Sequence, residues 1–275
     1  MQKTVQIIDN AMLENALKNA KDAGFSYVAI GFGENYIFPD DTWEDRVNYI
    51  KELLIKLGLE CVQTHLPYYE LRVSSETLDE AMEKSMIRGI IASRILGAKC
   101  AVMHTRSSIV TDFNTKASLQ DNLKAIKSYL PAAEENDVII AVENLPIFPG
   151  IPYEKFYAWN ANDLVDLVDA VDSPYCKICW DFGHAHLTGI DQVLALKTIG
   201  DRLCCTHVHN NFRRMDNHEI PTIGTIEWEK IMPVLSEIKY AGPLTLEVRY
   251  PNNRTLLSYL AHCYSSLEYL EDLMG

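Results

Sequence analysis

The chain lacks the features that would place it in a membrane, in an oxidising compartment or on a nucleotide. No apolar run approaches the roughly 18 residues of a membrane span, and Met1 to Asn10 hold no apolar core of a secretion signal. The seven cysteines, an odd number, favour reduced thiols. No GxGxxG follows the first apolar run, so no nucleotide cofactor is expected. The sequence therefore predicts a cytoplasmic protein without a membrane partner.

Positive charge is scarce as well. The 25 lysines and arginines are outnumbered by 38 aspartates and glutamates, and the net charge is -13. An acidic surface repels phosphate backbones, so nucleic acid is disfavoured as a partner and a small molecule is favoured. A single CxxC, Cys176 to Cys179, lies in an apolar stretch with no second CxxC after it. We therefore expect these two cysteines to be core residues rather than metal ligands.

Short apolar runs rich in β-forming residues alternate with longer segments of helical periodicity. The expected strands are Thr4–Ile8, Phe25–Phe32, Leu59–His65, Lys99–Thr105, Asp137–Asn144, Cys176–Phe182, Leu203–His209 and Leu244–Tyr250. The expected helices are Ala11–Ala23, Thr42–Leu57, Ser75–Leu96, Thr115–Asn136, Asn162–Val171, Asp191–Ile199, Glu227–Tyr240 and Arg254–Leu273.

Eight strand–helix units predict parallel strands, because each return to a parallel strand needs a crossover helix. Such strands form either an open doubly wound sheet or a closed barrel, and the missing GxGxxG removes the main support for the open sheet. No linker rich in Pro, Gly or Ser divides the chain, and 48% of the residues are hydrophobic. We therefore predict an α/β fold with one (β/α)8 TIM barrel domain over residues 1–275.

Metal-capable side chains stand at the carboxyl ends of the last six expected strands, about one β/α unit apart. They are His65, His104, Glu143, Asp181, His207 and Glu247. Active sites of parallel barrels form at this end. Singly, each glutamate is better explained as a solvated loop residue and each histidine as a satisfied polar residue. As a set at matching positions, they indicate a shared site.

The alternation of side chains along the strands supports this site. Ile139, Ala141 and Glu143 share one face of their strand, as do Thr245, Glu247 and Arg249. A carboxylate that ends an apolar strand costs several kcal/mol if it is buried without a partner. A shared cation would offset that cost.

Three further candidates lie in the loops beyond the strands. His184 follows Asp181 by three residues, and Asp216 and His218 lie in the loop after His207. Ligand sets that mix carboxylates with imidazoles suit zinc, manganese, iron or cobalt rather than calcium.

At these residues the sequence resembles the xylose-isomerase-like barrel superfamily, which holds sugar isomerases, sugar epimerases and the endonuclease IV family of abasic-site nucleases. The resemblance covers essentially the whole chain. The stretches that carry it are Thr64–Pro67, Val102–His104, Ala141–Asn144, Trp180–His184, Thr206–His209, Asp216–Glu219 with Gly224–Ile226, and Leu246–Val248.

The epimerase branch implies one divalent ion on four strand-end ligands, which here are Glu143, Asp181, His207 and Glu247. Manganese or zinc is expected, with cobalt and iron as alternatives. The resemblance also implies that Glu143 and Glu247 move the proton. The expected activity is isomerisation or epimerisation of a sugar or sugar phosphate through a metal-stabilised enediolate. Substrate contacts are expected from His65, His104, His184, His209 and Arg249. A homo-oligomer is compatible with this expectation.

The endonuclease branch is the first alternative and implies a phosphodiester hydrolase with three zinc ions. All nine of its ligands have a counterpart here, namely His65, His104, Glu143, Asp181, His184, His207, Asp216, His218 and Glu247. The chain departs from that branch at His209, Asn210 and Asn211, where the nucleases carry an Asn-Asp pair, and at Thr105-Arg106, where they usually carry Pro-Gly. Because these departures and the acidic charge favour sugar chemistry, we expect one tightly held metal.

A barrel that binds a metabolite without catalysis is the second alternative. Loss of one strand-end glutamate would have indicated it, and both glutamates are present.

Overall fold

The computed structural model of the chain describes residues 1–32, 41–67, 72–73, 80–108, 115–148, 156–250 and 255–275. Within these ranges, eight parallel strands close into a barrel in the order β1-β10-β9-β8-β7-β5-β3-β2. They are β1 (Lys3–Ile8), β2 (Tyr27–Gly31), β3 (Glu60–His65), β5 (Cys100–His104), β7 (Ile139–Glu143), β8 (Cys176–Asp181), β9 (Leu203–Val208) and β10 (Leu244–Leu246). The predicted (β/α)8 barrel is confirmed.

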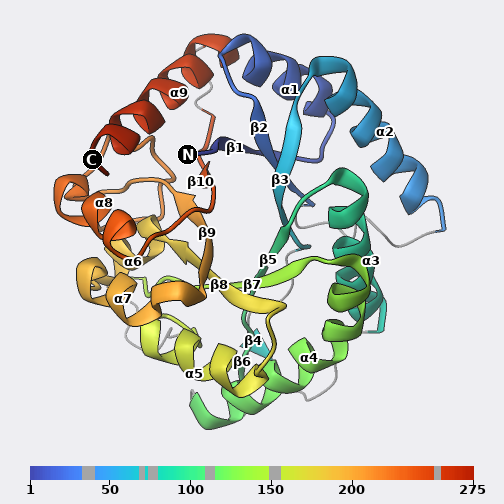
Figure 1. Cartoon of the computed structure of the whole chain (residues 1–275), viewed down its shortest axis with the longest axis vertical. Helices are drawn as coiled ribbons and strands as arrows, with labels where there is room; N and C mark the ends of the chain where they lie inside the picture. Colours follow the sequence, from blue (N-terminus) through green and yellow to red (C-terminus); the bar gives the residue numbers. More distant parts are fainter. Residues whose placement is uncertain (33–40, 68–71, 74–79, 109–114, 149–155, 251–254) are drawn as a thin grey trace.

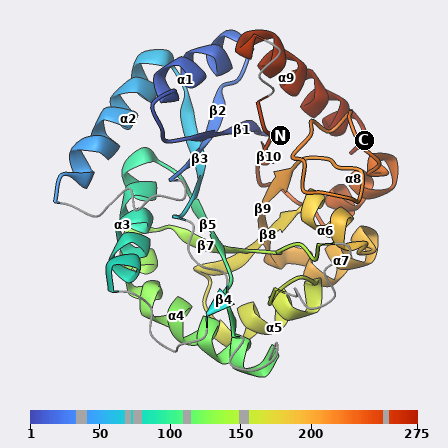
Figure 2. The same ribbon diagram turned by 180° about the vertical axis from the view of Figure 1, so that it is seen from behind.

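Helices form a ring outside the strands, seen from one side in Figure 1 and from behind in Figure 2. They are α1 (Leu13–Asp22), α2 (Trp43–Leu57), α3 (Glu80–Leu96), α4 (Thr115–Asn136), α5 (Ala161–Val171), α6 (Phe182–Thr188), α7 (Gln192–Ile199), α8 (Trp228–Glu237) and α9 (Leu256–Asp272). Within the described ranges, no helix combines the length and apolarity that a bilayer crossing requires.

Helix positions follow from the spacing of apolar residues. In α1 the buried side chains are Leu13, Ala16, Leu17 and Ala20, which recur every three or four residues and face the strands. Helix α2 stops at Gly58, whose φ of 62° is a left-handed conformation that glycine adopts without the steric penalty of a Cβ. The last helix is tied to the first strand, because Lys3 donates to Glu271 of α9 over 2.8 Å.

The strands separate two apolar layers. A large core between strands and helices includes Ile30, Val142 and Trp180. A small second cluster, built around Val102, Ala141, Cys179 and Cys205, fills the inside of the barrel. Since successive strand residues point to opposite faces, Glu143 faces the inside together with Ala141, as predicted.

The cysteines are core residues in the structure, as the sequence predicts for Cys176 and Cys179. Both are buried, with exposed fractions of 1% and 0%. Burial raises the pKa of the Cys176 thiol to about 12, so this thiol stays protonated and unreactive near neutral pH.

Four features differ from the sequence prediction. The last strand ends at Leu246 rather than Tyr250, because the Arg249 amide donates to the His218 carbonyl of a loop instead of continuing the ladder. The argument that placed Arg249 on a strand face is therefore wrong.

Two short parallel strands, β4 (Arg72–Val73) and β6 (Ser107–Ser108), and helix α6 were not predicted. The strands β4 and β6 are too short to give a sequence pattern, and tertiary contacts stabilise them. Helix α6 has only seven residues, which is also too short for a clear helical period. The expected starts at Ser75 and Arg254 lie outside the described residues.

Candidate metal centre at the barrel mouth

The carboxylate of Glu143 lies at the centre of the site, with imidazoles on both of its oxygens. Oε2 is 3.2 Å from Nε2 of His65 and 3.2 Å from Nε2 of His104. Oε1 is 3.0 Å from Nδ1 of His207 and 3.4 Å from Nδ1 of His184. The ladder pairs His104 with Glu143 and Asp181 with His207, so the strand ends lie at one level. Glu143 therefore joins histidines from three other strands and from the helix after β8.

The four residues expected to hold a cation, Glu143, Asp181, His207 and Glu247, come together in the structure. Each offers a ligand atom, and these atoms lie within 4.8 Å of one another. Nδ1 of His207 faces Glu143, Asp181 and Glu247 at 3.0, 3.9 and 3.3 Å. Three carboxylates around one imidazole are a donor set that fits a divalent transition metal. Because Glu143 and Asp181 are fully buried, their charges need a positive partner, either a cation or a protonated imidazole.

The cluster is partly open to solvent. The side chains of Glu143, Asp181 and His207 have exposed fractions of 0%, whereas Glu247 and His104 are exposed to 13% and 16%. A small molecule can therefore reach the cluster from the side of Glu247 and His104.

Asp181 has two structural tasks. It is the N-cap of helix α6, where its Oδ1 accepts the amide of His184 over 2.6 Å. Its Oδ2 lies 3.1 Å from Nε2 of His209. The spacing of three residues between Asp181 and His184 thus reflects a helix cap. The cap places the His184 side chain beside the carboxylates of the site.

The histidines at the site are fixed by the backbone. Nδ1 of His65 donates to the Leu66 carbonyl over 2.8 Å, and Nδ1 of His184 donates to the Asn144 carbonyl over 2.9 Å. Nδ1 of His218 donates to the Glu247 carbonyl over 2.7 Å. In each ring this directs Nε2 into the site. Histidines that bind metals are typically oriented in this way.

The ion pairs shift the pKa values in the cluster. Burial lowers the pKa of His207, but the carboxylates of Glu143 and Glu247 outweigh burial and raise it well above its usual range. Burial raises the pKa of Glu143, but the charge of His207 and then of His104 outweighs burial and lowers it well below its usual range. The carboxylates thus stay charged, and the imidazoles supply the positive charge that a cation would otherwise provide.

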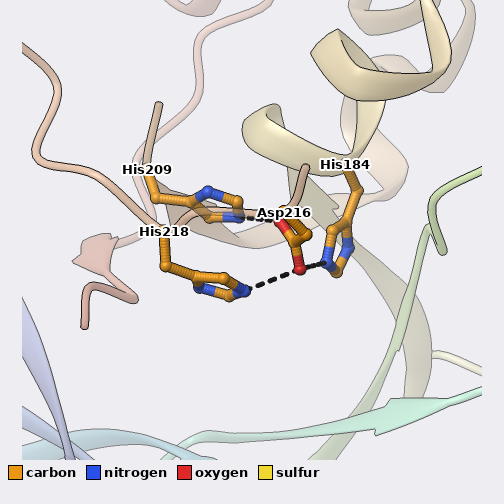
Figure 3. A group of neighbouring side chains, drawn as sticks. All are labelled: His184, His209, Asp216 and His218. Atoms are coloured by element: carbon orange, nitrogen blue, oxygen red, sulfur yellow. Dashed lines mark hydrogen bonds and ion pairs between the residues drawn. The ribbon is translucent and has the colours of Figure 1, made fainter. Parts of the chain in front are cut away.

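Further ligand candidates form three additional groups among the described residues, one of which, His65, His207 and Glu247, shares two members with the first group. The other two add new residues. His65, His104 and Glu143 form one of them. The other consists of His184, His209, Asp216 and His218, drawn in Figure 3 with the Asp216 carboxylate between the imidazoles. The further candidates His184, Asp216 and His218 therefore lie beside the residues at the strand ends. The Arg249 side chain is exposed, and its expected contact with substrate stays a prediction.

Two supporting residues were not identified from the sequence. Gln6 donates to Glu247 Oε1 over 2.8 Å, and Asn144 binds the backbone of Asp181 through both its oxygen and its nitrogen. For Gln6, the signal available in the sequence was a polar residue inside an otherwise apolar strand. For Asn144 the signal was its position directly after Glu143.

The fold and this cluster define a parallel (β/α)8 barrel with carboxylates and imidazoles gathered at its mouth. The chain belongs to the xylose isomerase-like TIM barrel family, whose profile matches residues 17–267.

Relatives of the chain carry different activities in their names. An uncharacterised protein of Sinorhizobium fredii is 30% identical over 59% of this chain. The matched region spans about half of the length of that relative. A fructoselysine 3-epimerase of Escherichia coli O157:H7 is 21% identical over 86% of this chain and 85% of its own length. A probable endonuclease 4 of Mesomycoplasma hyopneumoniae is 23% identical over 81% of this chain and 79% of its own length.

Solved structures share the fold of the chain. A xylose isomerase domain protein from Alicyclobacillus acidocaldarius superposes with a TM-score of 0.79 at 16% identity, over 100% of this chain and 99% of that one. A D-psicose 3-epimerase solved in the presence of D-fructose has a TM-score of 0.77 at 15% identity, and both chains are covered completely. The structural neighbours named for an activity include several sugar 3-epimerases.

Gly183 keeps open the space that His209 occupies. A Cβ at this position would lie 1.9 Å from Cε1 of His209. We expect Gly183→Ala to displace the His209 ring from Asp181 and to lower the free energy of unfolding by about 1–3 kcal/mol. A crystal structure of the variant and its denaturation curve measure both effects. The control is Leu194→Ala on helix α7, where the side chain is 65% exposed and its loss should leave the His209 ring in place. An unmoved His209 ring in Gly183→Ala would contradict the prediction.

Proposed function

We propose that the protein is a divalent-metal-dependent isomerase or epimerase of a sugar or sugar phosphate. The observation that carries the proposal is the pair of glutamates on either side of His207, with Glu143 Oε1 and Glu247 Oε2 at 3.0 and 3.3 Å from its Nδ1. A substrate held beside this point lies within reach of both carboxylates. The sugar 3-epimerases among the relatives support the same reaction class.

The proton transfer follows from the placement of these residues. One glutamate removes the proton from the carbon beside the substrate carbonyl, and the electron pair of that C–H bond moves to the carbonyl oxygen. The other glutamate returns a proton, to the same carbon for epimerisation or to its neighbour for isomerisation. A divalent ion on Glu143, Asp181, His207 and Glu247 would supply the Lewis acidity that acidifies this C–H bond. Gln6 holds Glu247 in position through its amide.

Sugar hydroxyls would be bound by the polar groups at the open side of the site. Nε2 of His104 and Nε2 of His65 face Glu143 from that half of the barrel. His184, His209 and Arg249 are the further expected contacts. Imidazoles and a guanidinium can donate hydrogen bonds both to hydroxyl oxygens and, more strongly, to phosphate oxygens. The proposal therefore includes both free and phosphorylated sugars.

A divalent ion is expected at the barrel mouth on Glu143, Asp181, His207 and Glu247. The test is anomalous diffraction at an absorption edge of manganese or zinc, from crystals grown with that metal. We expect a peak within about 2.0–2.3 Å of a ligand atom of each of these residues. A peak elsewhere, with these four side chains more than about 3 Å from any metal, would refute the assignment.

Proton transfer is expected to depend on each glutamate separately. The protein is incubated in deuterated water with ketoses that include D-psicose and fructoselysine, and deuterium at the carbon beside the carbonyl is measured by NMR. We expect Glu143→Gln and Glu247→Gln each to abolish exchange, because an amide cannot take up the proton. His262→Ala, on the surface helix α9, is the control and should exchange at the normal rate. Exchange retained in both glutamate variants would exclude the mechanism.

A phosphodiester hydrolase is the second candidate function. It is favoured by the group His65, His104 and Glu143 and by the group around Asp216, which lie beside the first four ligands as a multinuclear site requires. The endonuclease 4 relative points the same way. The test is cleavage of an abasic-site duplex by zinc-loaded protein. We expect no cleavage, because the net charge of -13 opposes binding of DNA. Cleavage that disappears in Glu143→Gln would replace the isomerase proposal.

A further inference from the structure

Three cysteine thiols meet inside the barrel below the mouth, toward the amino-terminal ends of the strands, a region called the barrel floor from here on. Cys100 lies on β5, and Cys204 and Cys205 are neighbours on β9. Cys100 and Cys205 belong to the small cluster inside the barrel, and Cys204 packs against it. All three are free thiols. Neither the proposed proton transfer nor the ligand groups at the mouth use them.

A bulge in β9 brings two adjacent side chains together. The ladder pairs Ile178 of β8 with Leu203 and Cys179 with Cys205, so Cys204 is an additional residue without a ladder partner on β8. Adjacent residues of a regular strand point to opposite faces, whereas the sulfurs of Cys204 and Cys205 lie only 3.9 Å apart. The local backbone therefore places these two thiols side by side.

The separation of 3.9 Å between the sulfurs of Cys204 and Cys205 fits two ligands of one cation. With metal–sulfur bonds of about 2.3 Å, two sulfurs at an angle of about 109–120° around a metal lie about 3.8–4.0 Å apart. A disulfide between the two is disfavoured, because neighbouring Cα atoms are only about 3.8 Å apart and disulfides join Cα atoms about 4.4–6.8 Å apart. The pair is therefore better suited to hold a metal than to form a bond between its sulfurs.

Cys100 faces this pair across the inside of the barrel. Hydrogen bonds with Cys204 and then with Cys205 raise the pKa of Cys100 well above its usual range. Hydrogen bonds with Cys100 and then with Cys205 lower the pKa of Cys204 well below its usual range, and the charge of Lys177 acts in the same direction. Cys204 is therefore the thiol of this group that most readily becomes a thiolate, the form that binds metals. Because Cys204 is also the partly exposed member, a cation can enter beside it.

We propose that Cys100, Cys204 and Cys205 bind one soft monovalent cation, Cu⁺, in a three-sulfur site at the barrel floor. Thiolates are soft ligands, which select Cu⁺ and zinc among the common metals. Zinc is almost always held by four ligands in structural sites, whereas Cu⁺ forms stable complexes with three sulfurs. A fourth sulfur would have to come from Cys179, the ladder partner of Cys205.

A cation at the floor would join two strands that do not pair with each other. In the barrel, β7 and β8 lie between β5 and β9. Cys100 and Cys205 lie on the same strands as His104 and His207 of the mouth, so the cation would fix these strands below the polar level. Because the ion binds the folded chain, we also expect it to raise the melting temperature. The site does not depend on the proposed isomerase activity.

The test supplies Cu⁺ to the reduced full-length protein under nitrogen, in competition with the chelator bicinchoninate, whose coloured Cu⁺ complex reports the copper that it keeps. We expect the unmodified protein to withdraw one equivalent and to gain the ultraviolet absorption of thiolate bound to Cu⁺. Cys204→Ala and Cys100→Ala should each lose this absorption and bind copper about tenfold more weakly or worse, since even groups that only support a metal ligand contribute that much.

The control is Cys263→Ala, which removes a buried cysteine of α9 and should match the unmodified protein. The imidazoles at the mouth are the same in every variant, so a difference in copper binding reports the thiols. Circular dichroism checks that each variant is folded. Where Cys100→Ala does not fold, the partly exposed Cys204→Ala decides the test.

The outcomes separate this site from the proposed function. Copper affinity and absorption that stay unchanged in Cys204→Ala would overturn the proposal, as would an unmodified protein that withdraws no copper. Equal loss of copper in Cys179→Ala would overturn the three-sulfur assignment in favour of four sulfurs. A zinc equivalent that is bound without copper and lost in Cys204→Ala would overturn the assignment to Cu⁺. Copper lost in Cys204→Ala and kept in Cys179→Ala and Cys263→Ala supports the proposal, even if every ketose fails to exchange.

Discussion

The buried carboxylate of Glu143 is the constraint around which the barrel mouth is arranged. A charge without solvent needs counter-charges at hydrogen-bonding distance, and here each oxygen faces imidazoles, from His65 and His104 on one side and His207 on the other. Those histidines come from β3, β5 and β9, so one carboxylate sets the relative positions of strands far apart in sequence. Any cation at the mouth enters a framework that this residue already holds together.

The inside of the barrel is built in two levels with opposite chemistry. The lower level is small and mostly apolar, with Val102, Ala141, Cys179 and Cys205 in one cluster. Two residues further along the same strands stand His104, Glu143, Asp181 and His207. Because side chains alternate between faces, a residue two positions on points the same way and lies nearer the mouth. The closed lower level keeps water from reaching the polar level from below, so that solvent approaches from one side.

The loop after β9 extends this framework to a third level. His209 continues the inward face of Cys205 and His207, and Asp216 and His218 reach back toward it. Two hydrogen bonds between Asn210 and Glu219 close the base of the loop, and the Asn210 side chain binds the Pro221 carbonyl. The loop is therefore a folded part of the site. It contacts one of the proposed proton-transfer residues, because His218 donates to the Glu247 carbonyl.

The alternation of β-rich runs with helical segments predicted parallel strands, because each return to a parallel strand needs a crossover helix, and the missing GxGxxG favoured a closed barrel over an open sheet. It also predicted the polar level, since strand-end residues two positions beyond Ala141 or Thr245 must share their inward face. It did not predict α6, because a seven-residue helix is stabilised by its Asp181 cap and by burial rather than by periodicity.

Only the tertiary structure decided how the polar residues group. The sequence placed His209 among substrate contacts, and the structure puts it between Asp181 and Asp216. The sequence extended the last strand to Tyr250, and a loop hydrogen bond from Arg249 ends it earlier. Alternation along a strand fixes which way a side chain points, whereas its partners depend on closure of the barrel and on loops that return from elsewhere in the chain. For this protein the sequence therefore determined the ligand types and their common edge, and tertiary packing determined which of them share a site.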